Sequence, residues 1–193
     1  MDVTEMKTQL VSTLKCIMPF SEPELEAIAD CFKAKALGKN TALLENGQVC
    51  REFYYVCKGC IRTYFTDVQG NIKTRYIMAE NHMGTAMASF INQNISLECI
   101  EAIEATEVLA ITYADFQRLR IEMPNWNHFY LRILEMAYCY QNSHIEQLIT
   151  LTPEQRYKML LREHPDLCQR LSNRVLASLL DIREETLSRI KSR

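Results

Sequence analysis

The sequence predicts an α+β fold in which helical segments flank a central block of short strands. Residues 4–37, and a long stretch after residue 124, carry apolar residues at helical spacing. Between residues 43 and 112, short segments rich in Tyr, Val, Ile and Phe alternate with turn signals such as ENGQ, DVQGN and NQN. Strands of this length and spacing are typical of a compact β-roll, sandwich or barrel.

Composition and the first residues narrow the class of protein. The chain has 193 residues and a formal net charge of −2, which excludes a protein that coats nucleic acid along its whole surface but allows a local basic patch. The start MDVTEMKTQL has an acidic second residue and no apolar run, so we expect no secretory signal. No stretch approaches the length of a membrane span. We therefore expect a cytoplasmic protein whose eight cysteines are reduced.

The first half of the chain is expected to begin with helices and continue as strands. Within the helical residues 4–37, Ser21 is a good N-cap, Pro23 lies in the first turn and Glu24 completes a capping box. The stretch REFYYVCKGCIRTYFTDVQGNIKTRYIM predicts three consecutive strands with Gly-containing turns. TYADFQRLRIEM then returns to helical spacing.

A long helix is predicted over residues 125–149, which contain no Gly or Pro. Its apolar residues, among them Phe129, Ile133, Met136 and Tyr140, recur at steps of three and four. Such a helix between a β domain and a second helical region is a natural dimer seam. Packing wholly within its own subunit explains the same periodicity equally well, so the pattern leaves both interpretations open.

The C-terminal region predicts a capped helix followed by two short helices. Thr152-Pro153-Glu154-Gln155 is a second capping box with Pro at the first helical position, and His164-Pro165 marks the end of that helix. LSNRVLASLLDIREETLSRIKSR then predicts two short helices with a break near residues 180–182. The apolar and small residues of this pair are Leu176, Ala177, Leu180, Ile182 and Leu187.

The second short helix is expected to present polar residues outward: Glu184, Glu185, Ser188, Arg189 and Lys191. From residue 170 to the end there are six Lys and Arg against three Asp and Glu, within a chain that is negative overall. This asymmetry indicates a phosphate-facing surface. Charge alone does not establish one, because any amphipathic helix pair exposes a charged face.

The segment LASLLDIREETLSRIKSR resembles the helix-turn-helix of the CRP/FNR superfamily, whose members include the cyclic-AMP receptor protein and the fumarate–nitrate regulator. The core E-T-x-S-R at residues 185–189 is similar to the recognition helix of the fumarate–nitrate branch. The order of elements upstream is similar too. The resemblance implies a double-stranded β-roll of the cyclic-nucleotide-binding type at residues 1–124, a dimerisation helix at 125–149 and a DNA-binding helix-turn-helix at 150–193.

The resemblance and the chemistry of base edges assign roles in the second helix. Glu185 is expected to accept from cytosine N4, Arg189 to donate bidentately to guanine, and Ser188 to lie against a base edge. The side chains expected to reach phosphate are Arg183, Thr186 and Lys191. The expected partners are therefore double-stranded DNA, a second copy of the chain, an unidentified small-molecule effector and RNA polymerase, without a membrane.

Three residues depart from the family pattern in this helix pair. The usual turn glycine is Asp181, the usual Ser or Thr N-cap is Arg183, and Glu184 replaces an Arg that some members use to read a base. The base preference of the cyclic-AMP branch therefore does not transfer to this chain.

The effector site of the cyclic-AMP branch is also altered. The segment comparable to its phosphate cassette is GTAMASFINQNIS, in which Gly84 and Ser96 persist while Thr85 and Ile95 replace the usual Glu and Arg. A buried phosphate without a cationic partner is costly, so we expect no binding of a cyclic nucleotide in the familiar way. His82 and Thr85 could line a pocket for another effector.

Cys57 and Cys60 form a C-x-x-C motif, with Cys50 seven residues upstream. This spacing suits half a zinc site, a redox pair or two ordinary strand cysteines. The resemblance places Lys58-Gly59 at a β-hairpin turn between two strands. No second C-x-x-C follows, and the N-terminal cysteine cluster of the iron–sulfur members is missing, so we expect no metal and no cofactor.

The interpretation that results is a transcription regulator of the CRP/FNR type that is not an enzyme, since no nucleophile elbow, phosphate loop or metalloprotease motif is present. Two alternatives remain open. One is a cysteine-based redox or metal sensor on the same scaffold, and the other is a ligand-binding module that has lost DNA binding.

Overall fold

The computed structural model describes residues 1–192, in which helices and antiparallel strands form two compact units. The first unit comprises Met1–Tyr64 and Ile77–Ile133, and the second comprises Phe65–Tyr76 and, among the described residues, 134–192. The boundaries expected at residues 124 and 149 stay a prediction, and Arg193, the last residue of the expected DNA-binding domain, lies outside the described residues.

The first unit begins with two helices, α1 (Val3–Ile17) and α2 (Glu22–Cys31). The capping box predicted for Ser21 and Glu24 is confirmed: the Glu24 carboxylate accepts from the Ser21 backbone N–H at 2.8 Å, and Pro23 lies in the first turn. The side chains of Leu10 and Leu14 on α1 are fully buried. Both N-terminal helices therefore form as their sequence predicts.

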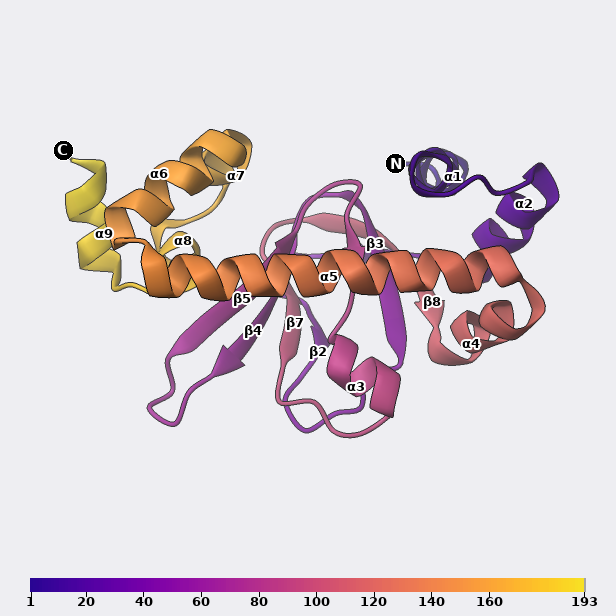
Figure 1. The fold of residues 1–193 in the computed structure, drawn as a ribbon, viewed down its shortest axis with the longest axis horizontal. Coiled ribbons are helices and arrows are strands. Elements are labelled where there is room, and N and C mark those ends of the chain that lie inside the picture. Colours follow the sequence, from indigo (N-terminus) through magenta and orange to yellow (C-terminus); the bar gives the residue numbers. More distant parts are fainter. Residues whose placement is uncertain (193) are drawn as a thin grey trace. The chain divides into compact units, whose positions relative to one another are not determined.

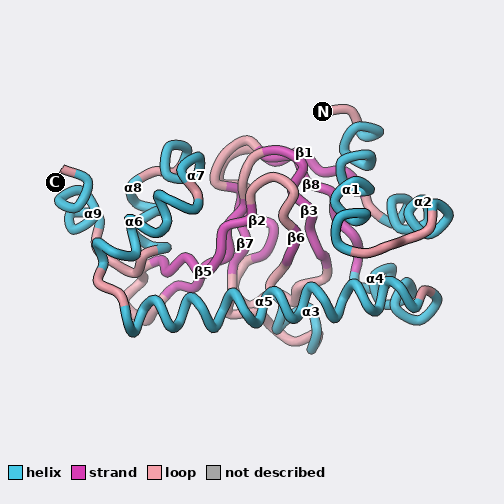
Figure 2. The backbone as a smooth tube through the Cα atoms, turned by 45° about the horizontal axis from the view of Figure 1, so that its top comes forward, coloured by secondary structure: helices cyan, strands magenta, loops and turns pink. Residues whose placement is uncertain are grey.

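Two four-stranded sheets follow, and they lie side by side in both views (Figures 1 and 2). Within the described residues, five pairs of neighbouring strands are antiparallel. The first sheet has the order β1 (Lys33–Leu37), β8 (Thr106–Thr112), β3 (Glu52–Lys58) and β6 (Met83–Gly84). The second has the order β2 (Ala42–Leu44), β7 (Cys99–Ala102), β4 (Ile61–Thr66) and β5 (Ile72–Met78). The short helix α3 (Met87–Asn92) follows β6, and α4 (Tyr113–Glu122) follows β8.

Residues 33–37 were expected to continue the N-terminal helices, and this expectation is wrong. KAKAL forms β1, which pairs with β8 from Lys33 opposite Ala110 to Leu37 opposite Thr106. The backbone hydrogen bonds to β8 decide the conformation, because tertiary pairing overrides the helical propensity of Lys, Ala and Leu.

The expected hairpin at Lys58-Gly59 is also wrong, because β3 and β4 belong to different sheets. The connection passes from one sheet to the other, and Gly59 has a positive φ of 87°. A Cβ atom added at Gly59 would lie 2.6 Å from the carbonyl oxygen of Ala105. Only glycine fits this crossing, for reasons of both backbone conformation and space.

Aromatic side chains form the core of the first unit. Phe116 lies at its centre, with ring centroids 5.3 Å from Phe53 and 5.2 Å from Trp126. Trp126 stacks on Phe129 at 4.8 Å, and Phe129 contacts Phe20 at 6.0 Å. The first turns of the long helix are thus anchored by its own aromatic residues.

The second unit contains the end of the β4–β5 hairpin and the C-terminal helices. The hairpin turn is built on Asp67, whose Oδ1 accepts from the backbone N–H groups of Gln69 at 2.9 Å and Asn71 at 2.8 Å, and Gly70 has a φ of 82° with nothing near its would-be Cβ. The helices are α5 (Pro124–Thr150), α6 (Pro153–Glu163), α7 (Pro165–Arg170), α8 (Asn173–Leu179) and α9 (Glu184–Lys191). The capping box predicted at Thr152 and Gln155 is confirmed.

Candidate nucleic-acid interface

The candidate interface is the helix pair α8–α9, which is built around a small apolar core. Leu176, Ala177 and Leu180 are buried on the α8 side, and Leu187 of α9 is fully buried. The Ser172 hydroxyl caps α8 by accepting from the Val175 N–H at 3.3 Å. Close packing of this kind is what a small residue at Ala177 permits, and it fixes which face of α9 remains outside.

The turn between the two helices has a left-handed residue where the family pattern has glycine. Asp181 has a φ of 51°, and the Ile182 N–H donates to the carbonyl of Ala177 at 3.0 Å. Asp and Asn are the side chains that tolerate this region best after glycine. The Asp181 departure is therefore compatible with a helix-turn-helix backbone. Arg183 is the N-cap of α9 and makes no side-chain capping bond.

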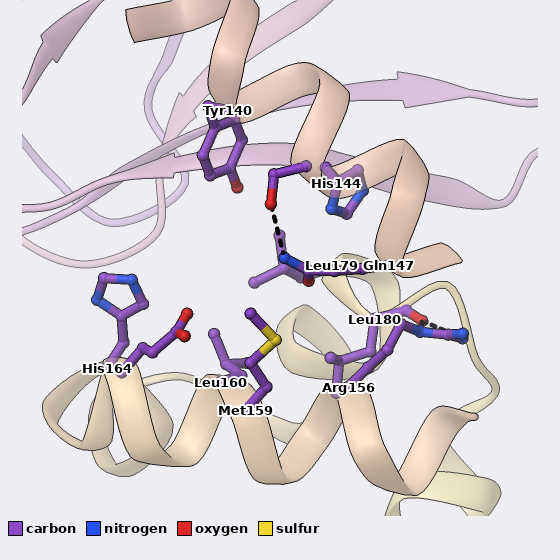
Figure 3. A pocket seen from close by; sticks show the side chains of 11 residues that line it. Tyr140, His144, Gln147, Arg156, Met159, Leu160, His164, Leu179 and Leu180 are labelled. Atoms are coloured by element: carbon purple, nitrogen blue, oxygen red, sulfur yellow. Dashed lines mark hydrogen bonds between the residues drawn. The ribbon is translucent and has the colours of Figure 1, made fainter. Parts of the chain in front are cut away.

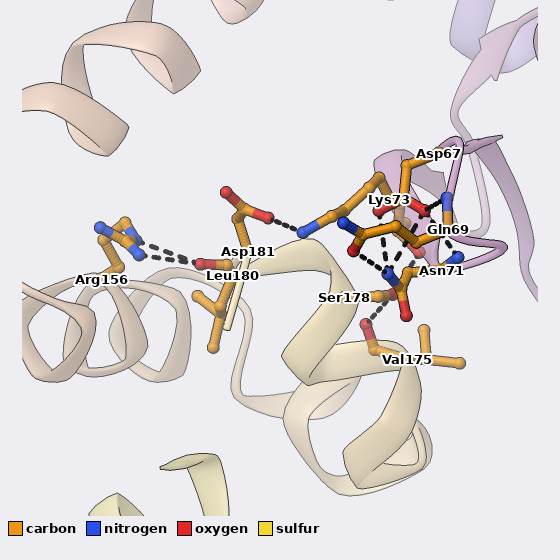
Figure 4. A network of polar contacts seen from close by, with 10 residues as sticks. Asp67, Gln69, Asn71, Lys73, Arg156, Val175, Ser178, Leu180 and Asp181 are labelled. Carbon is orange, nitrogen blue, oxygen red and sulfur yellow. Dashed lines mark hydrogen bonds and ion pairs between the residues drawn. The ribbon is translucent and has the colours of Figure 1, made fainter. Parts of the chain in front are cut away.

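Two cationic side chains hold this turn from opposite ends (Figure 4). Arg156 of α6 donates to the carbonyl oxygen of Leu180 from Nη2 at 3.0 Å and to that of Leu151 from Nη1 at 2.8 Å. Lys73 of β5 forms an ion pair with the Asp181 carboxylate. The contacts of Arg156 with Leu180 and of Lys73 with Asp181 join residues 24 and 108 positions apart, and no local motif in the sequence indicated them.

The outward face of α9 carries the residues predicted for base contact. Glu185, Ser188 and Arg189 are exposed, and Arg189 Nη2 lies 3.5 Å from Thr186 Oγ1. Among residues 1–192, Arg189 makes no ion pair with Glu185. The two side chains lie one helical turn apart, so both can approach the same ligand.

Lys191 and the two N-terminal glutamates of α9 also have structural roles. Lys191 Nζ donates to Asn173 Oδ1 at 2.6 Å and lies 5.8 Å from the centroid of the Tyr157 ring, so a contact with phosphate would exchange these partners. Glu184 and Glu185 lie in the first turn of α9, where negative charge stabilises the helix dipole.

The long helix α5 has two different faces. Phe129 and Ile133, two of the apolar residues that suggested a dimer seam, are buried, and Tyr140 packs edge-on against Tyr76 with centroids 4.7 Å apart. This stripe packs within the chain at Phe129 and Ile133, whereas Met136 is exposed and Tyr140 remains 38% exposed. A second stripe is exposed throughout and recurs at steps of three and four: His128, Leu131, Glu135, Tyr138, Asn142, Ile145 and Ile149. This is a seven-residue repeat, the spacing that two-stranded helix pairs use.

A cavity of about 90 Å³ lies between α5, α6 and α8 (Figure 3). Its lining combines Leu160 and Leu179 with the ring of His144. Burial first, and then the positive charges of Arg156 and Arg75, lower the pKa of His144 below its usual value, so the imidazole is neutral at pH 7. His144 also lines a more open cavity of about 410 Å³ beside the hairpin.

The residues predicted for the effector pocket do not share one environment. Gly84, Thr85 and Ser96 are buried, whereas His82 is exposed and Ile95 is 65% exposed. The Thr85 hydroxyl donates to the backbone carbonyl of Glu52 at 2.6 Å, and the Ser96 hydroxyl donates to that of Glu98 at 2.9 Å. Neither of the two cavities described above is lined by any of these five residues.

The cysteines are present as free thiols. Burial raises the pKa of Cys57 to about 12 and raises that of Cys50 as well, and Cys60 is fully buried. A thiol of raised pKa is a poor nucleophile and a poor metal ligand at neutral pH. Within residues 1–192, no group of three or more His, Cys, Asp or Glu side chains is placed to hold a metal ion, and no helix there is long and apolar enough to cross a membrane.

Comparison with known proteins shows what the central residues and the fold are similar to. Residues 34–122 match the family model of the cyclic nucleotide-binding domain. A search of curated protein sequences gave no significant match.

Several solved structures are similar to this chain. The c-di-GMP responsive global regulator CLP of Xanthomonas campestris has a TM-score of 0.71 at 16% identity, over 89% of this chain and 90% of that one. A structure from Eubacterium rectale, described as a transcriptional regulator of the CRP/FNR family, has 0.70 at 19% identity, over 89% and 82%. The catabolite activator protein of Thermus thermophilus has 0.59 at 19% identity, over 90% and 83%. At these identities the likeness concerns the fold alone: residues 34–122 are similar to the cyclic nucleotide-binding domain, and the fold of the chain is similar to that of CRP/FNR regulators.

Proposed function

We propose that the protein is a sequence-specific DNA-binding transcription regulator of the CRP/FNR type. The observation that carries the proposal is the helix pair α8–α9, in which a buried apolar core leaves Glu185, Ser188 and Arg189 exposed on one face of α9. A short exposed helix held on a second helix is the arrangement that enters the major groove in helix-turn-helix proteins.

In this proposal Arg189 and Glu185 read bases, and their neighbours position the helix. Arg189 donates to guanine O6 and N7, Glu185 accepts from cytosine N4, and Ser188 lies against a base edge. The phosphate contacts come from Arg183, Thr186 and Lys191, which position the protein without specifying sequence. Lys191 releases Asn173 when it binds phosphate.

We infer that the protein binds DNA as a homodimer through the exposed stripe of α5. Leu131, Tyr138 and Ile145 recur every seven residues, and Tyr138 is 68% exposed. Apolar residues at this repeat on a continuous helix are buried by a second, equivalent helix. The polar residues His128, Glu135 and Asn142 alternate with these apolar residues along the stripe. Two recognition helices then reach half-sites roughly 34 Å apart.

The domain of residues 34–122 is proposed to sense an effector other than a cyclic nucleotide bound in the familiar way. Thr85 stands where the family uses a ribose-binding carboxylate, and its hydroxyl is already bonded to Glu52. Ile95, which replaces the phosphate-binding Arg, is apolar and points to solvent.

The proposal has four further parts. It assigns an effector domain to residues 1–124, a dimerisation helix to 125–149 and a DNA-binding domain to 150–193. It also includes contact with RNA polymerase, a location in the cytoplasm and the absence of enzymatic activity.

Selection of random DNA duplexes by the purified protein tests the proposal. We expect enrichment of an inverted repeat containing guanine in each half-site. Arg189→Ala is expected to lower discrimination at that guanine by about 1–3 kcal/mol. Arg162→Ala is the matched control, because it removes one exposed charge of α6 that pairs with Glu163. If the wild-type protein enriches no sequence, the chain is a ligand-binding module without DNA recognition. If Arg189→Ala keeps wild-type discrimination, the assignment of α9 is wrong.

A further inference from the structure

The β4–β5 hairpin is bonded to the helix-turn-helix at two places (Figure 4). Lys73 forms an ion pair with Asp181 in the turn between α8 and α9. One position along β5, the hydroxyl groups of Thr74 and Ser178 lie 2.5 Å apart. The Ser178 hydroxyl also donates to the carbonyl of Val175 at 2.9 Å, so in the Thr74 pair it serves as the acceptor.

The hairpin that makes these bonds is itself ordered by local contacts. The Asp67 carboxylate accepts from two backbone N–H groups of the turn and from Asn71 Nδ2 at 3.0 Å. Further along β5, Arg75 Nε donates to Gln141 Oε1 of α5 at 3.3 Å. A segment that is braced at its tip and on α5 can hold a neighbouring element in one orientation.

We propose that the β4–β5 hairpin is a latch that positions the helix-turn-helix for DNA binding, through Lys73 on Asp181 and Thr74 on Ser178. This inference rests on the proposed DNA-binding function. Glu185, Ser188 and Arg189 remain exposed while both bonds are made, so the latch does not cover the base-reading face. Its role is to set the direction in which that face points.

The latch is weak enough to open and close. Lys73 and Asp181 are each 49% exposed in their side chains, and solvent-exposed ion pairs contribute little. The hydroxyl pair adds one ordinary hydrogen bond. A helix pair that is free to reorient loses more entropy when it binds. We therefore expect loss of either bond to weaken DNA binding by about two- to tenfold.

Asp181→Asn distinguishes the effect of losing the Lys73 ion pair from the effect of removing a negative charge near DNA. Asn has the same shape as Asp and tolerates the same left-handed backbone. Removing a negative charge from a DNA-binding domain strengthens binding if charge alone acts, whereas the latch predicts weaker binding. Glu154→Gln is the matched control, because it removes a negative charge from the Lys158 ion pair of α6 and leaves the latch intact.

Thr74→Val tests the second bond without any change of charge. Valine keeps the branched shape, and Ser178 retains its bond to the Val175 carbonyl. DNA affinity is measured at fixed salt on the selected duplex for the wild type, Thr74→Val, Asp181→Asn and Glu154→Gln. Weaker DNA binding of Thr74→Val and Asp181→Asn, with unchanged binding of Glu154→Gln, supports the latch. Tighter binding of Asp181→Asn together with unchanged binding of Thr74→Val overturns it.

Hydrogen exchange provides a readout that does not depend on DNA. In the free protein, Asp181→Asn and Thr74→Val are expected to accelerate exchange in residues 66–75 and in residues 173–183, and Glu154→Gln is not. If the wild-type protein binds no duplex, the proposed function is wrong while exchange still tests whether the hairpin restrains the turn. Exchange identical to wild type in both variants overturns the latch, whatever the DNA affinity.

Discussion

Arg156 is expected to be the main polar support of the second unit, and replacing it with Met tests this. Its guanidinium bonds to the carbonyl oxygen of Leu151, just after α5, and to that of Leu180, at the end of α8. Hydrogen bonds from a charged group contribute about 1.5–3 kcal/mol each, and an unpartnered buried carbonyl is costly. Leu180 is buried. We expect Arg156→Met, which keeps the aliphatic stem, to lower the free energy of unfolding by about 2–4 kcal/mol.

The same substitution has a second, independent consequence at His144. The charge of Arg156 is one cause of the lowered pKa of His144, so its removal raises that pKa toward the ordinary value of about 6.5. Burial is the larger cause and remains, so the rise is partial.

Urea unfolding followed by circular dichroism, and NMR titration of the His144 ring, measure the two effects of Arg156→Met. Arg162→Met is the matched control on the same helix, since the Arg162 side chain is 75% exposed and forms an ion pair with its neighbour Glu163 at 3.2 Å. If Arg156→Met leaves both the unfolding midpoint and the His144 pKa at their wild-type values, Arg156 does not support the turn.

Three further predictions concern the dimer, the effector domain and pH. Tyr138→Lys places an unpaired charge in the exposed stripe and is expected to weaken the dimer at least about tenfold in sedimentation equilibrium. Met136→Lys, just beside the stripe, is expected to leave the dimer unchanged. Equal effects of the two variants would refute dimerisation through the exposed stripe. Cyclic AMP is expected to show no micromolar affinity in calorimetric titration, because Thr85 is already bonded to Glu52; micromolar binding would contradict the reasoning. His144 has a lowered pKa when folded, so the unfolded chain binds more protons in acid, and stability falls as pH drops below about 6.5. Denaturation at several pH values should show this loss in the wild type and less of it in His144→Gln; an identical pH dependence would argue against it.

The elements that the sequence predicted correctly are those with strong local signals. The capping boxes at Ser21 and Thr152 place two helix starts, and the turn at Gly70 places the β4–β5 hairpin. The helices α3 and α7 are only six residues long, too short for a helical period to stand out. Residues 33–37 form a strand because of their partner strand β8, whose paired residues run from Ala110 opposite Lys33 to Thr106 opposite Leu37, far along the chain.

In the candidate site, too, the residues set by local spacing were predicted from the sequence and the long-range contacts were not. The exposed residues of α9 follow from helical spacing around Leu187, which is local information. The ion pair of Lys73 with Asp181 joins residues 108 positions apart, so no local pattern in the sequence predicts it. The exposed stripe of α5 was hidden for another reason: Glu135 and Asn142 interrupt it, and the more apolar stripe nearby is the one that packs inward.

The two positive-φ glycines described above, Gly59 and Gly70, are expected to tolerate different substitutions. At Gly59 a Cβ atom would lie 2.6 Å from the Ala105 carbonyl oxygen, so no other amino acid fits. In a saturation library, only variants that keep glycine at this position should remain folded. At Gly70 nothing lies within 4 Å of the missing Cβ, so only the backbone conformation is demanding. Asn and Asp, which adopt that conformation at small cost, should survive there. Saturation mutagenesis would thus distinguish a position closed by space from one restricted only by its backbone angle.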